Sequence, residues 1–544
     1  MKMKKLLVSV LGLSLLLPAI TSAAAAPVSP IKASVNTPAA ELRATLDYLL
    51  SEHFTLAVNA LTKGYSKSKD AAEAYQALDQ NVTDMKPVIA SIYGAARAAE
   101  FVRIFREHNT YTNDLIKSSR NNDKALRGKV EGETAKFVKE FAAFLNAVTA
   151  AKLPRKTAEE MLQLHENKVQ KAFDEYAAGD YQDAYKAYRE GIYEVFKLSK
   201  VLSSAIAAQM PDKYQQTRAD TEAADLRSLL SRLLSEHFAL STLQMQEQFD
   251  TRGASDALLI AEAANTEDLN VAMASVYGAA DGIAFKKIWV INHLNAQSDY
   301  VNAVKNNNTP NLENIKSRID DSTTELAAFL DTATNKNLPL AAGQAALRKH
   351  EGQVQQVFDQ YAAGNYKGAA KTSREGFKFM FGIGKSLSSV IVLQFNEKYA
   401  ENMPVTPPDP NPVPSSPAAT TIWMKVNSKQ LKLNGIVSQM DTTPFVWNGL
   451  TFIPLRFLSD GIGAEAVFDA KTGMITVKAD KDVLKFWVGK DYMTVNGVNK
   501  SVGTKVIVKD GRTAIPLRFI GELLGWDVHY QKSDQSITLT KPMS

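Results

Sequence analysis

The sequence contains an internal duplication of a helical segment. Leu49-Leu50-Ser51-Glu52-His53-Phe54 returns as Leu233-Leu234-Ser235-Glu236-His237-Phe238, so that His53 corresponds to His237 with a shift of 184 residues. Around the first copy, apolar residues recur at the spacing of one helix face, which places a histidine in the middle of an apolar stripe. The residues of this stripe are Leu42, Leu46, Leu49, His53 and Ala57. Most of the chain is therefore expected to consist of two copies of one helical unit.

The N-terminal segment, residues 1–26, is typical of a signal peptide. Lys2, Lys4 and Lys5 precede an apolar stretch, Leu6–Ile20, and the small residues Ser22-Ala23-Ala24 offer a cleavage site. A membrane anchor is the alternative, but this stretch is shorter than the ~20 residues that a spanning helix needs. We therefore expect a secreted, extracellular protein with no membrane span after cleavage, and association with the cell wall is an option.

Charge and cysteine content exclude several classes of function. The formal net charge is +5 and falls to +2 without the three lysines of the signal peptide, so no strong attraction for nucleic acid is expected. The chain has no cysteine, which excludes disulfides, thiolate metal sites and cysteine nucleophiles. Neither Gly-x-Ser-x-Gly nor His-Glu-x-x-His is present, so no hydrolase motif indicates an enzyme.

With 544 residues the chain is too long for one core. Two tandem all-α units are predicted at 38–212 and 222–400, each a bundle of six helices, because short connections make consecutive helices antiparallel neighbours. In the first unit the predicted helices are Glu41–Lys63, Asp70–Tyr93, Ala95–Ser119, Lys124–Ala150, a fifth that begins at a capping box of Thr157 and Glu160 and runs to Ala178, and a sixth that ends near Gln209.

The first, third and fifth helices of each unit carry one inward-facing histidine each. These are His53, His108 and His165 in the first unit and His237, His293 and His350 in the second, and together they are six of the seven histidines in the chain. The spacing changes once between the units: Phe105 lies three residues before His108, whereas Trp289 lies four residues before His293. A one-residue insertion in the third helix, accommodated as a π-bulge, would explain this change.

Three imidazoles that converge in a bundle core form a candidate site for a divalent metal ion. Such sets suit Zn or Cu, with haem as a second option, and Asp84 or Asp268 could complete them. The alternative is three core histidines that are each satisfied by a carboxylate, a tyrosine or a backbone carbonyl. Because Zn–N bonds are about 2.0–2.1 Å long, ring nitrogens more than about 5 Å apart would exclude a shared ion. Glu52 and Glu166 adjoin histidines but face about 100° away from them, so they are expected to be solvated.

A proline-rich linker at 403–421 precedes a strand-rich region at 423–541. Its prolines favour an extended chain of about 3.1 Å per residue, which makes a stiff spacer. Beyond it, hairpin turns are predicted at Asn434-Gly435, Asn448-Gly449, Asn496-Gly497 and Asp510-Gly511.

The strand-rich region is itself a repeat. Phe452–Phe457 reappears as Ala514–Phe519 after 62 residues, with the Ile-Pro-Leu-Arg-Phe sequence intact. We expect an α+β module of two copies, each with β-hairpins around a short helix that begins at Pro454 or Pro516. In the strand after the first short helix, Phe468 is expected to face the core.

This region resembles the copper amine oxidase N-terminal domain family of bacterial surface and secreted proteins. The resemblance rests on the Asn-Gly turns, on Thr-x-Ile-Pro-Leu-Arg-Phe and on Gly-[Ala/Trp]-x-[Ala/Val]-x-[Phe/Tyr], each present twice between Trp423 and Lys541. It implies a stalk-like accessory or binding module, remote from the chemistry of true amine oxidases. Their catalytic part needs a tyrosine in Asn-Tyr-[Asp/Glu] beside a three-histidine copper site, whereas the nearest match here is Asn365-Tyr366-Lys367. The resemblance therefore does not imply amine oxidation.

Two functions follow as hypotheses. The first is a secreted, non-enzymatic cell-envelope or extracellular scaffold protein, whose partner is a cell-wall polymer or another envelope protein. The second is an extracellular protein that binds Zn or Cu through a three-histidine site in each helical unit.

Overall fold

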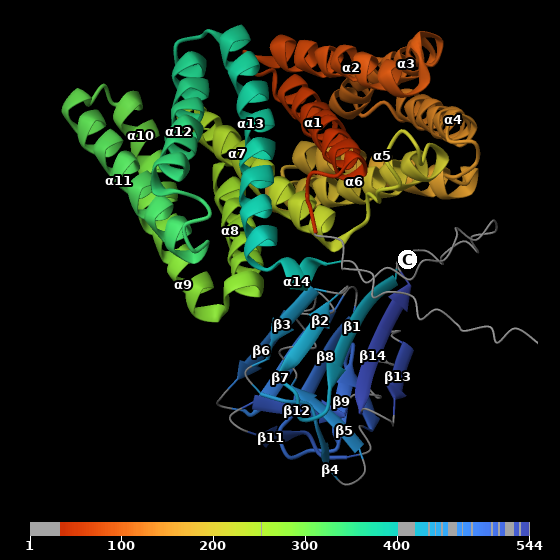
Figure 1. The fold of residues 1–544 in the computed structure, drawn as a ribbon, viewed down its shortest axis with the longest axis vertical. Coiled ribbons are helices and arrows are strands. Elements are labelled where there is room, and N and C mark those ends of the chain that lie inside the picture. Colours follow the sequence, from red (N-terminus) through yellow and green to blue (C-terminus); the bar gives the residue numbers. More distant parts are fainter. Residues whose placement is uncertain are drawn as a thin grey trace, which may run out of the picture.

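The computed structural model describes residues 33–251, 253–400, 419–433, 436–440, 442–447, 450–454, 465–469, 472–479, 482–501, 504–509, 512–516, 527–531 and 535–542. Residues 33–400 are mostly helical, and the described part of 419–542 is rich in strands (Figure 1). The predicted signal peptide, most of the predicted linker and the short helices expected after Pro454 and Pro516 lie outside the described residues. Strand β1 (Ala419–Lys425) begins inside the predicted linker because it pairs with β14 (Ser536–Pro542).

The helices of the first half begin and end close to the predicted ranges. They are α1 (Pro38–Ser66), α2 (Ala71–Tyr93), α3 (Ala95–Asn121), α4 (Lys124–Val148), α5 (Arg155–Ala178) and α6 (Tyr181–Gln209). The Thr37 side chain caps α1 by accepting a hydrogen bond from the amide of Ala40, one of the free donors of the first turn. The prediction that Thr157 caps the fifth helix is wrong. Helix α5 already begins at Arg155, and Pro154 is its N-cap residue with the extended ψ of 139° that ends the preceding loop.

The helices of the second half repeat this order with one interruption. They are α7 (Glu222–Asp250), α8 (Ser255–Tyr277), α9 (Ala279–Ile288), η1 (Trp289–Leu294), α10 (Asn295–Lys305), α11 (Thr309–Ala333), α12 (Leu340–Ala362), α13 (Tyr366–Gln394) and the short α14 (Asn396–Tyr399). Segment η1 is a π-helix, the conformation that accommodates one extra residue in a helical path. The predicted π-bulge is thus confirmed, and α9, η1 and α10 together correspond to α3.

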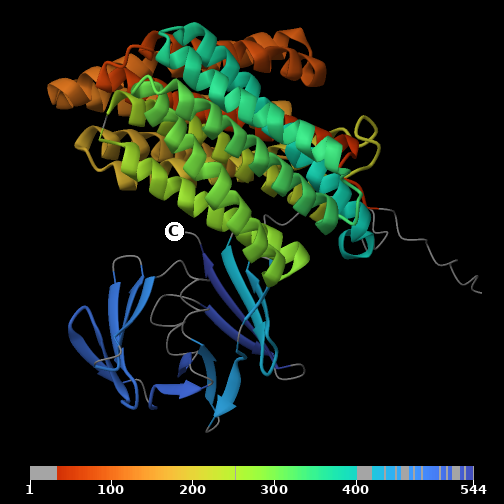
Figure 2. The ribbon, with the colours of Figure 1, turned by 90° about the vertical axis from the view of Figure 1, so that its left-hand side faces the viewer.

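A large hydrophobic cluster spans the two halves, beside a second cluster that belongs to the first half alone. Helices α1 and α6 of the first half pack against α7 of the second, and α13 packs on α7 and α1 (Figures 1 and 2). Buried side chains of both halves form one continuous cluster, in which Phe54 and Tyr188 lie with Phe238 and Phe377. Because the cluster crosses the boundary, removal of one half would expose the core of the other.

Charged side chains cross the boundary between the halves in a reciprocal pattern. Arg43 of α1 binds Asp225 of α7 at 2.5 Å, and Arg227 of α7 binds Glu41 of α1 at 3.0 Å. The two arginines occupy equivalent positions of the duplication, as do the two carboxylates. Such exchange is the property of a two-fold symmetric interface, so the halves are arranged like the subunits of a symmetric dimer.

Among the described residues, α13 is the one helix whose length and apolar composition would allow it to cross a membrane. We expected no membrane-spanning segment after the signal peptide, and by length and composition α13 is an exception to this expectation. Half of its apolar window is buried in the structure. Phe377 and Ile391 of this helix belong to the shared core, so packing accounts for its apolar character.

The described strands form three sheets. They are β1 and β14, already given, with β2 (Gln430–Leu433), β3 (Ile436–Gln439), β4 (Phe445–Trp447), β5 (Leu450–Pro454), β6 (Glu465–Asp469), β7 (Met474–Ala479), β8 (Asp482–Trp487), β9 (Tyr492–Val495), β10 (Val498–Ser501), β11 (Ile507–Lys509), β12 (Arg512–Pro516) and β13 (Asp527–Gln531). The strand orders are β13-β14-β1-β2-β3, β10-β9-β8-β7-β6 and β11-β12-β5-β4. Buried side chains from all three sheets, such as Ile422, Ile453 and Phe486, form the core of this region.

The 62-residue repeats are interleaved. The first repeat provides β1–β3 with β6 and β7, and the second provides the corresponding β8–β10 with β13 and β14. Each five-stranded sheet therefore combines strands of both repeats. In the four-stranded sheet, Ile453 of β5 pairs with Ile515 of β12, its own counterpart in the second repeat. The repeats are thus related by a local two-fold axis, and neither completes a five-stranded sheet alone.

The strands on either side of each predicted Asn-Gly or Asp-Gly turn pair with each other in antiparallel register. Asn496 and Gly497, which lie within the described residues, have φ values of 51° and 84°, as a two-residue hairpin turn requires. The prediction that Phe468 faces the core is wrong, since this side chain is 55 % exposed. It lies on the edge strand β6, at the margin of the core that buries its cross-strand partner Ile475.

Candidate metal centres

The structure brings the three histidines of each half together. Site 1 consists of His53 on α1, His108 on α3 and His165 on α5, and site 2 consists of His237 on α7, His293 on η1 and His350 on α12. In each site one ring nitrogen per histidine can be chosen so that all three lie within 4.8 Å of one another. Both trios therefore meet the limit of about 5 Å for a shared ion.

Close helix packing positions the first histidine of each site. Phe54, which follows His53, packs directly on Gly191 of α6, where an added Cβ would lie 2.0 Å from a ring atom. The same phenyl ring contacts His165, with ring centroids 5.8 Å apart. Since only glycine fits at this position, α6 can approach α1 closely and hold the phenyl ring against the site. The second half repeats the arrangement with Phe238, Gly376 and His350.

A carboxylate lies beside the imidazoles of site 1. Oε1 of Glu166 is 3.3 Å from Nε2 of His108 and 3.7 Å from Nε2 of His165. The expectation that Glu166 is solvated is wrong, because the residue is only 3 % exposed. Helix α5 packs against α1, α4 and α6, so its buried face is wide enough to include both of these consecutive residues.

Burial controls the protonation of site 1. It lowers the pKa of His108 to about 3 and that of His165 to about 4, and it holds the pKa of His53 well below the usual range. Burial also raises the pKa of Glu166 to about 8. The imidazoles are therefore neutral at pH 7, which is the form that binds metal ions. A cation would favour the ionised form of Glu166 and add an oxygen ligand to three nitrogen ligands.

In site 2 the carboxylate lies behind one of the histidines. Nδ1 of His293 is 2.7 Å from Oε1 of Glu351, while Nε2 of His293 is 3.0 Å from Nε2 of His237. Burial opposes the charge of His293, but the charge of Glu351 outweighs it and raises the pKa of this imidazole. Burial likewise opposes the charge of Glu351, and His293 reverses this and lowers the pKa of the carboxyl. Burial lowers the pKa of His350 to about 4 and holds the pKa of His237 well below its usual range.

Several ring nitrogens in these sites have no hydrogen-bond partner among the described residues. Neither nitrogen of His53 or of His350 is hydrogen-bonded, and Nδ1 of His108 and Nδ1 of His165 are also unpaired. An unpaired buried polar group costs about 1–3 kcal/mol. The alternative of fully satisfied core histidines therefore does not describe these rings, and the donor set present fits an imidazole-binding metal ion.

The carboxylates that were expected to complete the sites bind elsewhere. Asp84 binds Arg374 at 2.8 Å and Asp268 binds Arg189 at 2.6 Å, in both cases across the boundary between the halves. Glu52, which was expected to be solvated, is 2 % exposed and also binds Arg374. These acidic groups thus hold the two halves together and do not belong to the histidine clusters.

The residues that sequence reasoning missed are Glu166 and Glu351. Both follow a site histidine directly, at 165–166 and 350–351, so that the dipeptide His-Glu occurs at equivalent places of the two halves. This repetition was the signal that could have identified them. Glu166 alone was considered above, and it was expected to be solvated because a single helix stripe is narrower than the face that α5 buries.

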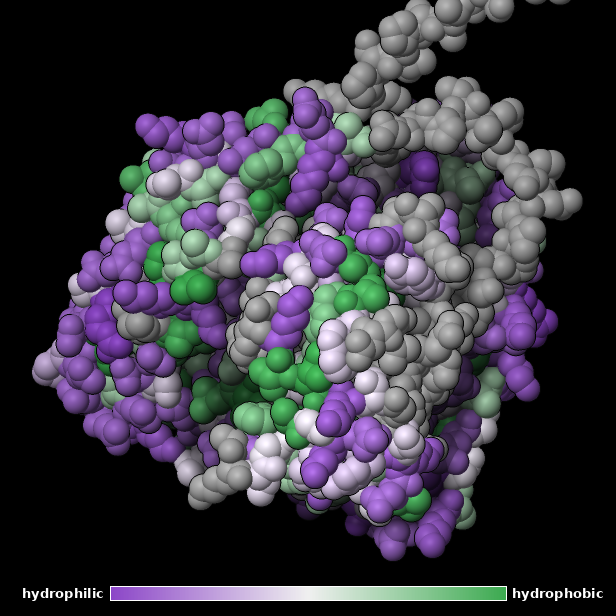
Figure 3. All heavy atoms as spheres, turned by 90° about the horizontal axis from the view of Figure 1, so that it is seen from below, coloured by the Kyte–Doolittle hydropathy of each residue, from purple (hydrophilic) through white to green (hydrophobic). Residues whose placement is uncertain are grey.

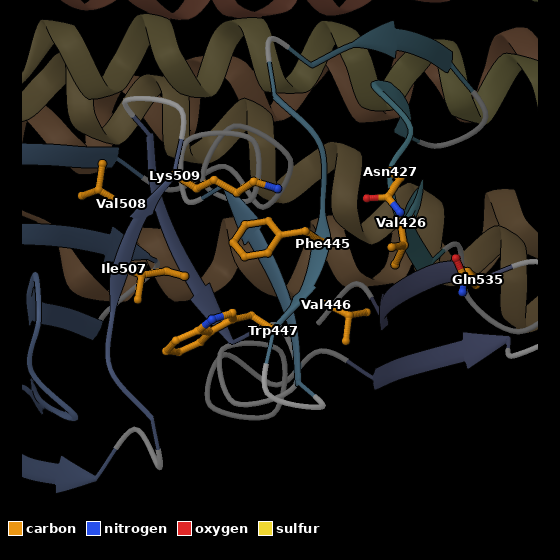
Figure 4. Close-up of a pocket in the computed structure, with 9 residues that line it drawn as sticks. All are labelled: Val426, Asn427, Phe445, Val446, Trp447, Ile507, Val508, Lys509 and Gln535. Carbon is orange, nitrogen blue, oxygen red and sulfur yellow. The ribbon is translucent and has the colours of Figure 1, made fainter.

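The strand-rich region carries a different candidate surface. Seen from below, hydrophobic residues gather near the middle of the molecule (Figure 3). A hollow of about 510 Å³ lies between β4 and β11 (Figure 4). Val446, Trp447 and Val508 line it and are exposed, and the ammonium group of Lys509 lies 4.1 Å from the ring centroid of Phe445. An open hollow of this kind suits contact with a partner better than enclosure of a small ligand.

Residues 418–539 match the family described as copper amine oxidase N-terminal domain, as predicted from the sequence. The match is to a non-catalytic domain of those enzymes and covers the strand-rich region alone. The Asn365-Tyr366-Lys367 sequence lies at the start of α13, where the Asn365 side chain caps the helix by accepting from the amide of Gly368. Neither the curated proteins nor the solved structures include a significant match to the chain.

Proposed function

We propose that the helical region binds two divalent transition-metal ions, one in each half, and that these ions are Zn or Cu. The proposal treats α1–α6 and α7–α13 as two equivalent six-helix bundles with one site each. The observation that supports it most strongly is the convergence of three imidazoles in each half, with ligand nitrogens within 4.8 Å of one another. The buried nitrogens without another partner support it independently.

The donor chemistry favours these metals over others. Mg and Ca prefer sets made entirely of oxygen ligands, whereas neutral imidazoles suit Zn and Cu. A bound ion would satisfy the buried nitrogens and stabilise the folded chain, by about 4 kcal/mol when the free metal is at 1,000 times its Kd. The proposed role is binding rather than catalysis, since neither Gly-x-Ser-x-Gly nor His-Glu-x-x-His occurs in the chain.

Elemental analysis of the untagged full chain, after dialysis against Zn or Cu, tests this function. Two bound equivalents are expected. The double variant His53→Ala/His165→Ala and the double variant His237→Ala/His350→Ala should each retain one equivalent. His529→Ala, in the strand-rich region, serves as the control and should retain two. If the wild-type chain is folded by circular dichroism and binds less than one equivalent, the proposal is wrong.

A second proposed function concerns the strand-rich region. We propose that its two hairpin-and-short-helix repeats form an exported, non-enzymatic module that binds a cell-wall polymer or another envelope protein. The family match and the exposed hydrophobic hollow around Trp447 support a binding role. In a pull-down with washed cell walls, the full chain should be retained and Trp447→Ala should be retained less. Loss of the full chain in the wash would count against this function.

A further inference from the structure

The two candidate sites differ in the residues behind their first histidine, although the helices that carry them repeat. At two positions in contact with this region the second half has polar residues where the first half has apolar ones. The pairs are Ser241 in place of Ala57 and Glu262 in place of Leu78. All four residues are buried, so the difference is not a matter of surface variation.

Ser241 and Glu262 form a chain of hydrogen bonds that ends at His237. The hydroxyl of Ser241 donates to Oε1 of Glu262 at 2.6 Å, and the same Oγ is 3.4 Å from Nδ1 of His237. Because the hydroxyl hydrogen is directed at the carboxylate, Oγ can only accept from the ring. The proton of His237 is thereby held on Nδ1, which leaves Nε2 as an acceptor that can take a hydrogen bond from Nε2 of His293.

The acceptor nitrogen of His237 faces a second oriented imidazole. Nε2 of His237 lies 3.0 Å from Nε2 of His293, and Nδ1 of His293 is held by Glu351 at 2.7 Å. Two rings of site 2 therefore have their outer nitrogen held by a carboxylate, directly or through Ser241. Outer partners of this kind fix the tautomer and orientation of a metal ligand, and their loss typically costs about 10–100-fold in metal affinity.

Site 1 has a different arrangement. Ala57 and Leu78 offer no polar side-chain atom, and neither ring nitrogen of His53 is held by a carboxylate or a hydroxyl group. Its carboxylate, Glu166, lies on the Nε2 side of His108 and His165. At that position Glu166 can become a ligand, but it does not orient a ring from behind.

We propose that the two sites are not equivalent, and that Ser241 and Glu262 are positioning residues that make site 2 the tighter one. The first equivalent of metal then enters site 2 and the second enters site 1. This inference rests on the proposed metal binding and adds an order of filling to it.

Trp289 provides a signal from site 2 alone. Its ring centroid lies 4.7 Å from that of His237 and 4.9 Å from that of His293. It is the one tryptophan between residues 33 and 400, since the other four lie at 423, 447, 487 and 526. Cu²⁺ quenches the fluorescence of an indole that it closely approaches, so quenching of Trp289 measures occupancy of site 2.

The experiment is a Cu²⁺ titration of the full chain, with tryptophan fluorescence and total bound metal measured on the same samples. In the wild type, quenching should be complete at the first bound equivalent, and the second should bind without further change. In the variant Ser241→Ala/Glu262→Leu, which carries the first-half residues, the affinity of site 2 should fall by about 10–100-fold. The quenching should then accompany the second equivalent.

Two further variants separate positioning from mere structural support. Glu262→Gln keeps an acceptor oxygen for Ser241 and should retain the wild-type order of filling. Leu78→Ala removes buried volume at the equivalent position of the first half, and it should lower stability without changing that order. If quenching in the wild type is spread evenly over both equivalents, or if the Ser241→Ala/Glu262→Leu variant keeps the wild-type order, the inference is overturned while metal binding stands. If no metal binds, the proposed function itself fails.

Discussion

Arg374 on α13 binds both carboxylate oxygens of Glu52, the residue before His53 on α1, at 3.1 and 2.8 Å. The same guanidinium group also binds Asp84 of α2. The equivalent contact runs in the opposite direction: Arg189 on α6 of the first half binds Glu236, the residue before His237, and Asp268. Each half therefore supplies an arginine that binds the helix carrying the first site histidine of the other half.

The Arg374 contact should be a large contributor to stability. Arg374→Ala leaves Glu52, which is 2 % exposed, as a buried charge without its cation. Loss of one partner of a buried pair costs about 3–5 kcal/mol, and chemical denaturation at pH 7 measures this loss. Arg155→Ala is the matched control, because Arg155 makes only an exposed pair with Glu159 on the same helix, and it should cost less than about 0.5 kcal/mol. Equal losses in the two variants would contradict this assignment.

Because Phe54 packs on Gly191, replacement of Gly191 by alanine should lower the stability of the protein, whereas the same replacement at the unobstructed Gly132 should raise it. Gly191→Ala places a Cβ 2.0 Å from the Phe54 ring, and overpacking of this kind costs about 1–3 kcal/mol. Gly132→Ala in α4 meets nothing within 4 Å and should stabilise the protein by about 0.5–1 kcal/mol, because alanine is the better helix former. Thermal unfolding of both variants tests the pair, and a stabilised Gly191→Ala protein would show that the helices can separate.

Asp47 predicts a specific dependence of stability on pH. Its buried carboxylate accepts hydrogen bonds from Ser199 and Ser228 at the interface of the halves, and burial raises its pKa from 3.8 to about 6. Since the folded chain holds this proton more tightly than the unfolded chain, the contribution of Asp47 is fully present below about pH 4 and is lost as the pH rises through 6.

The variant Asp47→Asn cannot titrate at this position. Relative to the wild type, it should gain about 2–3 kcal/mol of stability between pH 4 and pH 7. Urea unfolding of both proteins at pH 4, 5, 6 and 7 measures the difference in their free energies of unfolding. All other titrating groups are the same in the two proteins, so their contributions cancel in this difference. Parallel pH profiles for the two proteins would mean that Asp47 is ionised in the folded state throughout this range.

The interleaved repeats predict that the strand-rich region unfolds as one unit. Ile422 of β1 and Leu484 of β8 occupy equivalent positions in the two repeats, and both are buried. Replacement of either by alanine should cost about 2–5 kcal/mol and should lower the same unfolding transition in calorimetry. Val498→Ala is the control, because Val498 is 65 % exposed, and it should change stability by less than about 0.5 kcal/mol. Two separate transitions in the Ile422→Ala protein would contradict the interleaving.

Local sequence patterns were sufficient to predict where the helices lie and that their histidines face inward. Helical periodicity placed His53, His108 and His165 on apolar faces, and these faces are buried or nearly so in the structure. The spacing from Trp289 to His293 was sufficient to predict the π-helical segment. Such features are encoded within one or two turns of helix, where the spacing of neighbouring residues decides which side chains share a face.

Contacts between distant parts of the chain decided the rest. Asp84 pairs with Arg374, 290 residues away, while Glu166 beside His165 turns inward because α5 is covered by three other helices. The interleaved sheets likewise join β1 to β14, from opposite ends of the strand-rich region. No local spacing encodes these pairings, because they depend on how much apolar surface whole helices and sheets can bury against one another.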